Sequence, residues 1–379
     1  MTGFYEKIKE LGASPRNVSA TVLAGDHIGE KGILEKGHVV FLSEKDGFLA
    51  SHQNDLEAAA SALSRASGQA LSGEISSSSA ASVEEISGIP VFLEPLGGDS
   101  KIVICGAGHV AYALLSMAKM TKFEVTVVED RREFASAAED AGADRVICAP
   151  FEEALGQIRG DNETYFVIMT RGHHYDMDCL KAIAEKPCAY IGMMGSRRRI
   201  SIVKEKMAEA GVSAQVLQEL HAPIGLAIGA ETPQEIAVSV MAEIIQVRHE
   251  KRHSFGYPKD LLKAITEETG QTSPAAARKI LATIVRRRGS APRTAGTKML
   301  IREDGSAVGT IGGGSLEAAV TERAMKLFSE TRTDGFAKAA DRSGKEIVPE
   351  LFRADLQADA AEREGMVCGG MIDVFLESC

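Results

Sequence analysis

The strongest chemical signal in the chain is a glycine-rich turn between a strand pattern and a helix pattern. Residues 106–111, GAGHVA, directly follow the apolar run at residues 101–105. Gly106 permits a sharp turn, Gly108 lets the backbone approach a phosphate, and Ala111 keeps the helix close to the strand. The start of the following helix adds partial positive charge. The segment predicts a site for a phosphate-bearing nucleotide; a Rossmann-like domain that binds none, or an unrelated ligand, is the alternative.

An acidic residue follows at the end of the next strand pattern, residues 125–128. Glu129 ends this run directly and is the predicted partner of a ribose hydroxyl, since a dinucleotide site places an acid about 20 residues after the glycines. Asp130 and Arg131 come next. They are further candidate contacts, or solvated residues at a helix start.

A second polar loop, residues 170–178, follows the apolar run at residues 166–169 and contains Arg171 and His173. Ligands of open α/β sheets bind beyond the carboxyl ends of the strands, where this loop should lie. Its two histidines and two aspartates could ligate a metal, but no cysteine or Glu-x-x-His pattern accompanies them. We therefore predict no metal site, and a polar helix start is the alternative interpretation.

A third loop of this kind follows another strand pattern and combines Gly195, Ser196 and Arg197. Backbone amides and planar guanidinium groups bind anions well. The loop predicts a phosphate contact, with solvated arginines at a helix start as the alternative.

The last hundred residues carry a further group of candidates. Gly312, Gly313 and Gly314 expose backbone amides suited to a phosphate or a pterin, and Arg293 would suit the same anion. Cys368 is followed by two glycines, where a thiolate could contact molybdenum or carry sulfur. Structural glycines and an inert cysteine are the alternatives.

The elements that must position these residues divide into three parts. In residues 99–250 strand patterns alternate with helix-length intervals, which favours a parallel sheet covered on both faces. Residues 1–98 and 274–379 are similar to each other, and residues 251–273 are predicted to be a linker. The predicted fold is α/β, with a Rossmann-like doubly wound parallel sheet flanked by two smaller related α/β modules.

The similarity of the flanking modules consists of four short matches in the same order, which indicates a diverged duplication. The matched pairs are ATVL at 20–23 with ATIV at 282–285, KDG at 45–47 with EDG at 303–305, LEAA at 56–59 with 316–319, and IPVFLE at 89–94 with IDVFLE at 372–377. The first copy lacks the second copy's glycine triplet and cysteine. We therefore expect that copy to keep the fold without the site.

Composition excludes several classes of protein. The 379 residues carry a net charge of −10, and only 5% are aromatic, which argues against binding nucleic acid. Six cysteines without a CxxC pair indicate reduced thiols, as in the cytoplasm. The start of the chain lacks a signal-peptide pattern, and no apolar run approaches the length of a membrane span. We expect a cytoplasmic protein without membrane or nucleic-acid partners.

Taken together, the motifs resemble the XdhC/CoxI family, maturation factors for xanthine dehydrogenase and related molybdenum hydroxylases. The segments that carry the resemblance are GAGHVA at 106–111, VVEDR at 127–131, TRGHHYD at 170–176, IGMMGSRRR at 191–199, HAPIGL at 221–226, GAETPQEIAVSVMAEII at 229–245, GSAPR at 289–293, GTIGGGSLEAAV at 309–320 and VCGG at 367–370. The order of the parts is atypical, because this family places its XdhC/CoxI domain before its Rossmann-like domain.

The resemblance implies that the protein acts as a cofactor chaperone rather than as a catalyst. Such a protein would bind the molybdenum cofactor in a molybdopterin form, assist its sulfuration with a cysteine desulfurase, and deliver it to an apo molybdenum hydroxylase. The alternative function is that of an NAD(P)-dependent oxidoreductase or a nucleotide-binding regulatory protein. Binding of NAD(P) or another nucleotide, and formation of a homodimer, are further possibilities. The candidate cofactor-binding residues are Gly106, Gly108, His109, Ala111, Glu129, Asp130, Arg131, Arg171, His173, Gly195, Ser196, Arg197, Arg293, Gly312, Gly313 and Gly314.

Overall fold

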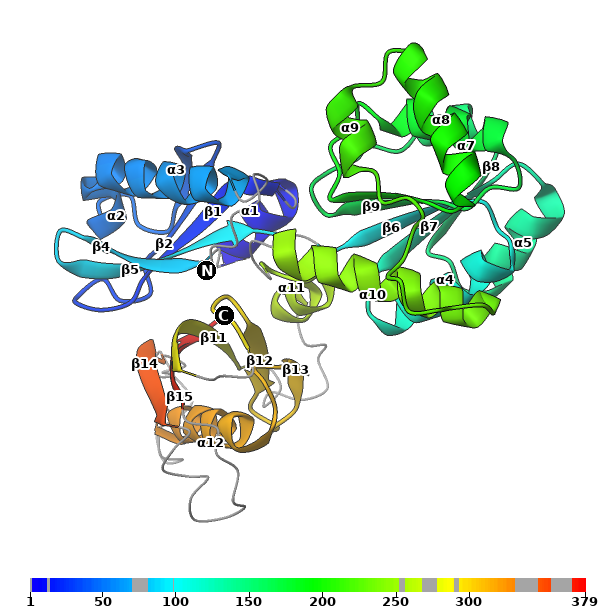
Figure 1. Ribbon diagram of the computed structural model, residues 1–379. Coiled ribbons are helices and arrows are strands. Elements are labelled where there is room, and N and C mark those ends of the chain that lie inside the picture. The colour runs from blue at the N-terminus through cyan, green and yellow to red at the C-terminus, as the bar shows by residue number, and fades with distance from the viewer. Residues whose placement is uncertain are drawn as a thin grey trace. The chain divides into compact units, whose positions relative to one another are not determined.

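The computed structural model contains two compact units, one formed by residues 1–98 with 253–379 and the other by residues 99–252 (Figure 1). The residues that the structure describes are 2–11, 14–69, 81–97, 99–251, 256–267, 278–289, 293–330, 347–355 and 370–379. Within these ranges, every helix is too short or too polar to cross a membrane.

The unit of residues 99–252 is built on a five-stranded parallel sheet in the order β10-β9-β6-β7-β8. Its strands are β6 (Lys101–Cys105), β7 (Glu124–Glu129), β8 (Arg145–Cys148), β9 (Thr164–Ile168) and β10 (Tyr190–Met193). The strands β6, β7 and β9 lie close to the predicted strand patterns at residues 101–105, 125–128 and 166–169, because each is a short apolar run bounded by turns. The predicted doubly wound parallel sheet is confirmed.

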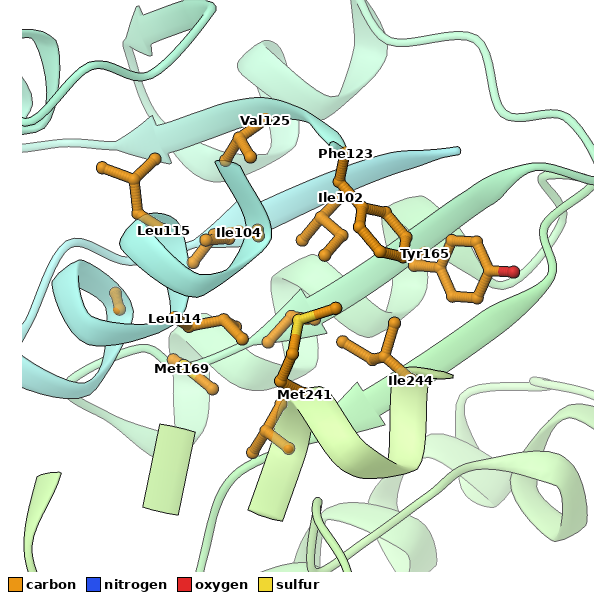
Figure 2. Close-up of a cluster of buried hydrophobic side chains, with 14 of the residues drawn as sticks. Ile102, Ile104, Leu114, Leu115, Phe123, Val125, Tyr165, Met169, Met241 and Ile244 are labelled. Atoms are coloured by element: carbon orange, nitrogen blue, oxygen red, sulfur yellow. The ribbon is translucent and has the colours of Figure 1, made fainter. Parts of the chain in front are cut away.

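Helices cover both faces of this sheet, as its apolar strands require. They are α4 (His109–Met120), α5 (Arg132–Asp140), α6 (Phe151–Gly156), α7 (His173–Ile183), α8 (Arg197–Glu209), α9 (Ala214–Glu219) and α10 (Pro233–Lys251). Alternate residues of β6 enter opposite cores: Ile102 and Ile104 pack with α4 and α10, and Val103 and Cys105 pack with α6, α7 and α8. Figure 2 shows the first core, where Leu114 of α4 and Met241 of α10 meet over the strands.

The strand order places a topological switch point between β6 and β9. From β6 the chain continues to β7 and β8 on one side, and then returns to add β9 and β10 on the other side. The carboxyl ends of all five parallel strands lie at one edge of the sheet. The loops after β6 and β9 therefore flank the crevice in which such sheets bind ligands.

The other unit contains two five-stranded antiparallel sheets with the same connectivity, in the orders β3-β2-β1-β5-β4 and β13-β12-β11-β15-β14. The first module comprises α1 (Thr2–Leu11), β1 (Ser14–Val22), β2 (Lys31–Glu35), β3 (His38–Leu42), α2 (Phe48–Ser51), α3 (Gln53–Gln69), β4 (Ser82–Ile86) and β5 (Ile89–Leu96). The second comprises α11 (Lys259–Thr266), β11 (Lys279–Gly289), β12 (Lys298–Arg302), β13 (Ala307–Gly309), α12 (Gly314–Glu330), β14 (Glu350–Asp355) and β15 (Gly370–Ser378). The two flanking modules are thus related, as predicted.

Strand register confirms two of the four matches between the modules, and a third lies on corresponding helices. Ala20 pairs with Gly32 and Leu93, and Ala282 pairs with the equivalent Met299 and Leu376. The helices α3 and α12, which contain the two LEAA segments, each pack against their own sheet (Figure 1).

The match of residues 45–47 with residues 303–305 is wrong. The first segment follows β3, whereas the second forms the turn between β12 and β13. The true equivalent of that turn is the one at Lys36 and Gly37, where Gly37 and Gly305 have φ values of 90° and 82°. The error has a physical reason, because Asp-Gly suits many tight turns and carries little positional information.

The segment of residues 251–273, predicted to be a linker, contains the packed helix α11. Leu261 and Ile265 of α11 join Phe4 and Ile8 of α1 in one core. The two helices occur in corresponding places, each ahead of its sheet. An eight-residue helix carries too few turns for its periodicity to stand out from a polar connector.

Reciprocal contacts join the two modules. Lys31 of β2 binds Glu377 of β15 at 2.8 Å, and Lys298 of β12 binds Glu94 of β5 at 2.5 Å. Lys31 and Lys298 begin corresponding strands, and the two glutamates are also equivalent. All four side chains are almost fully buried. The modules therefore contact one another as the two protomers of an isologous dimer would.

Candidate functional site

The crevice at the switch point depends on close contact between the loops after β6 and β9. Gly106 has φ of +105°, and a Cβ atom built on it would lie 2.5 Å from the carbonyl oxygen of Met169. Any other residue would clash there, so glycine is required for folding as well as for the turn. The predicted role of Gly106 in turning the chain agrees with this geometry.

The start of α4 offers backbone amides to a ligand. Gly108 is the N-cap residue, has an extended backbone with φ of −89°, and makes no side-chain cap. A Cβ atom at Gly108 would meet nothing within 4 Å. His109 begins the helix and is exposed, while Ala111 is buried against the sheet. First-turn amides without a side-chain cap suit an anion.

Glu129 holds the glycine turn from the neighbouring strand. Its Oε2 atom accepts a 2.8 Å hydrogen bond from the backbone amide of Ala107. The guanidinium and backbone amide of Arg131 donate to the same carboxylate, and Glu129 is only 1% exposed. Four donors satisfy its lone pairs. The ribose hydroxyl predicted to bind Glu129 would have to displace one of them.

Asp130 and Arg171 connect the ends of β7 and β9. Arg171 donates two hydrogen bonds to the Asp130 carboxylate, at 2.5 and 2.8 Å, and a third at 2.6 Å to the hydroxyl of Tyr175. The hydrogen bonds from Arg171 lower the pKa of Asp130 to about 2. These two predicted site residues are therefore brought together, and a guanidinium group stays exposed at the rim of the crevice.

A buried ion pair, which the sequence motifs do not reveal, supports the loops after β9 and β10. Asp176 of α7 is fully buried and accepts hydrogen bonds from Arg199 of α8 and from the hydroxyl of Thr170. Burial raises the pKa of Asp176 despite these hydrogen bonds. The sequence of the arginine run at residues 197–199 indicates anion binding. Its third residue, Arg199, instead forms the buried ion pair with Asp176.

A second network lies beyond β10. Glu243 of α10 accepts hydrogen bonds from the hydroxyl of Tyr190 and from the backbone amide of Gly225, and its carboxylate lies 3.2 Å from His221 Nδ1. Burial and the Glu243 carboxylate raise the pKa of Tyr190. The network fixes the loop of residues 221–226, whose sequence alone indicates no more than a turn.

The remaining candidates of this unit lie at the same edge. Ser196 caps α8 by accepting a hydrogen bond from the amide of Arg199, and Arg197 follows it in an exposed position. Gly195 is half-buried between β10 and α8. His173 begins α7 and is exposed, and this helix also lacks a side-chain cap. Helix starts after β6, β9 and β10 therefore adjoin the crevice.

The glycine triplet of the last module has a different partner from the one predicted. Amides of Ile311 and Gly313 donate to the Glu317 carboxylate, at 3.1 and 2.8 Å, and the Thr310 hydroxyl donates to it as well. Gly314 begins α12. A phosphate or a pterin at the Gly313 amide would have to displace this carboxylate, and the Gly312 amide donates to the Thr310 hydroxyl at 3.2 Å. Arg293 is exposed, and Cys368 lies outside the described residues.

Two family models match the chain. Residues 102–244 match the XdhC Rossmann domain, and residues 275–336 match the XdhC and CoxI family. Together these segments include both the crevice and the glycine triplet.

Three curated relatives are similar to parts of the chain. The uncharacterized protein YqeB of Escherichia coli (strain K12) is 36% identical over 170 residues, which cover 42% of this chain and 29% of the relative. A probable xanthine dehydrogenase subunit of Bacillus subtilis (strain 168) is 30% identical over 158 residues, 42% of this chain and 46% of the relative. The molybdenum cofactor insertion chaperone PaoD of E. coli (strain K12) is 30% identical over 95 residues, 25% and 30% of the two chains. The matches span less than half the length of each relative.

Proposed function

Because the chain belongs to the XdhC and CoxI family, as its motifs predicted, we propose that it acts in the maturation of a molybdenum hydroxylase. In this role it binds the molybdenum cofactor, assists its sulfuration with a cysteine desulfurase, and inserts it into an apo enzyme of the xanthine dehydrogenase type. The names of two relatives support the proposal, one as part of a xanthine dehydrogenase and one as a cofactor insertion chaperone. On this proposal the protein is a chaperone rather than a catalyst.

The observation that carries the proposal is the gathering of an uncapped helix start and an exposed arginine at the carboxyl edge of the parallel sheet. The uncapped start of α4 faces open space at Gly108, and the exposed cationic group of Arg197 belongs to a neighbouring loop, while Arg171 is engaged with Asp130. A molybdopterin carries a phosphate, which such amides and guanidinium groups bind well. The three buried or half-buried acids of this edge do not oppose an anion strongly, because each is paired with an arginine.

Individual residues have separate roles in this proposal. Amides of the α4 start hold the phosphate, Arg197 and His173 contact the anion from the loops on the other side, and Arg171 closes the rim. The bound cofactor supplies the molybdenum centre that the hydroxylase uses. Cys368, in the unit of residues 1–98 and 253–379, is proposed separately as a contact for the sulfur or molybdenum of the cofactor. A dinucleotide form of the cofactor, or NAD(P), is the second ligand class to test in the same crevice.

The proposal is tested by expressing the full chain in a strain that makes molybdenum cofactor. We expect the purified protein to carry molybdenum and pterin, measured by elemental analysis and by fluorescence of the oxidised pterin. Arg197→Ala should lower the cofactor content about tenfold, because a charge-assisted hydrogen bond is lost. The matched control is Arg145→Ala, since Arg145 is exposed at the amino end of β8, the opposite edge of the sheet.

Absence of both molybdenum and pterin from folded protein would contradict the proposal, as would an equal loss in the Arg145→Ala variant. Cys368→Ser should reduce activation of an apo hydroxylase, measured in a separate assay from cofactor content, and unchanged activation would refute a role for this thiol. Titration with NADH and NADPH by calorimetry distinguishes the oxidoreductase alternative, which requires binding of one of them.

A further inference from the structure

A cluster of metal-ligating side chains lies in the first module, away from the crevice. It consists of His27 in the loop before β2, Glu30 at the end of that loop, and Glu44 after β3. His27 Nδ1 is 3.6 Å from Glu30 Oε2 and 3.5 Å from Glu44 Oε2. All three ligand atoms lie within 4.8 Å of one another. Two ligands of a common ion, each about 2.1 Å from it, are about 3.0–3.5 Å apart, so small movements would complete the geometry.

Glu30 gives the cluster a buried anchor. Its side chain has no exposed surface. Two backbone amides fix its carboxylate, with Phe48 donating at 2.8 Å and Leu49 at 3.0 Å. Within the described ranges, the basic side chain at ion-pair distance from Glu30 is that of His27. Burial of an ionised carboxylate is costly, a nearby cation offsets that cost, and each oxygen retains a second lone pair for one.

The opposite side of the cluster is open to water. The side chains of His27 and Glu44 are 43% and 55% exposed. A bound ion could therefore be reached from solvent and would keep water in its remaining coordination positions. Imidazole with two carboxylates is a donor set for a first-row divalent ion such as Zn²⁺.

Comparison with the second module indicates that these side chains are not needed for the turn itself. In the first module the amide of Glu30 donates to the carbonyl of His27 at 3.0 Å, and in the second the amide of Thr297 donates to the carbonyl of Thr294 at 3.3 Å. The carbonyls of Glu30 and Thr297 then accept from the equivalent residues Val22 and Ile284, both at 2.9 Å. Threonines form the corresponding turn contacts, so the turn itself requires neither side chain. The Glu30 carboxylate also binds the amides at the start of α2, which leaves the imidazole of His27 without a role in the turn.

We propose that His27, Glu30 and Glu44 bind one divalent transition-metal ion, with water completing its coordination. The first module was expected to keep only the fold; on this proposal it has its own site, separate from the crevice. The ion stabilises the loop before β2 and offsets the buried charge of Glu30.

The experiment uses the full chain after removal of metals by a chelator. We expect calorimetry to detect about one equivalent of Zn²⁺ bound with micromolar affinity, and Co²⁺ to give visible absorption bands of a protein-bound ion. His27→Ala and Glu44→Gln should each weaken Zn²⁺ binding at least tenfold. Both residues are largely exposed, so both variants should keep the circular dichroism spectrum of the parent protein.

The matched control is His38→Ala in the same module. His38 is 81% exposed and lies 3.6 Å from a single carboxylate, that of Glu57. Its loss should leave Zn²⁺ affinity unchanged. The proposal is overturned if the parent protein binds no Zn²⁺, if His27→Ala binds as tightly as the parent, or if His38→Ala weakens binding equally.

Discussion

Two glycines of the phosphate-binding turn, two positions apart, have different physical roles. Gly106 has a positive φ and touches the carbonyl of Met169, whereas Gly108 has an extended backbone and open space beside it. The first is needed for the fold. The second leaves room for a ligand at the start of α4.

This difference gives a prediction for two alanine substitutions. Gly106→Ala should lower the free energy of unfolding by about 1–3 kcal/mol or more, since it adds backbone strain and a clash. Gly108→Ala should leave stability within about 0.5 kcal/mol and lower cofactor content, because its Cβ would project into the space beside the α4 amides. Urea denaturation and the cofactor assay measure the two effects. Equal destabilisation by both substitutions would contradict this assignment.

Elements of the parallel sheet are connected at their carboxyl ends by charged pairs. The Asp130–Arg171 pair connects the loops after β7 and β9, and the Asp176–Arg199 pair connects α7 and α8. Residues that look like ligand contacts in the sequence also hold the loops in place. A substitution there changes binding and loop position together.

The first of these pairs predicts a pH dependence. Arg171 lowers the folded-state pKa of Asp130 from an ordinary value of 3.8 to about 2, so the pair stabilises the fold above pH 4 and loses this effect as the pH falls toward 2. Arg171→Gln should cost less than about 1 kcal/mol at pH 7, because Arg171 is 38% exposed. That cost should shrink as the pH falls through about 2 and disappear below it.

The pKa of Asp130 can be followed by NMR of its carboxyl carbon. In Arg171→Gln it should rise toward its ordinary value. An unchanged pKa, or a stability cost that grows as the pH falls, would refute the assigned cause.

At the scale of the whole molecule, the unit of residues 1–98 and 253–379 contains its own pseudo-dimer. Equivalent strands of the two modules exchange equivalent buried Lys–Glu pairs, and Phe92 and Phe375 join one apolar cluster between them. The two related modules thus place both halves of an isologous contact in one chain.

Removal of one partner from such a pair should be costly. Lys298→Met is expected to lower the free energy of unfolding by about 3–5 kcal/mol, because the Glu94 charge is left buried without its partner. The double variant Lys298→Met with Glu94→Leu should recover much of that loss. Urea denaturation of the full chain measures both.

The matched control is Lys101→Met, which removes the half-exposed pair of Lys101 with Asp161. Its cost should stay below about 1 kcal/mol. A double variant as unstable as Lys298→Met alone would show that the pair itself is not what joins the modules there.

The sequence determined the features that depend on neighbours along the chain. Apolar runs predicted β6, β7 and β9 within one or two residues, and matched segments predicted the related modules. The glycine turn and the acidic residue at the end of β7 could also be predicted from the sequence, because one strand–helix–strand unit fixes the spacing between them.

Only the tertiary structure decided which side chains meet. Asp176 and Arg199 are 23 residues apart, Tyr190 and Glu243 are 53 apart, and Lys31 and Glu377 are 346 apart. Local pattern carries no information about such pairs, since they depend on how strands and helices pack. Packing likewise decided that the Glu129 carboxylate accepts a hydrogen bond from the glycine turn and that Glu317 accepts one from the glycine triplet. It also brought His27, Glu30 and Glu44 together.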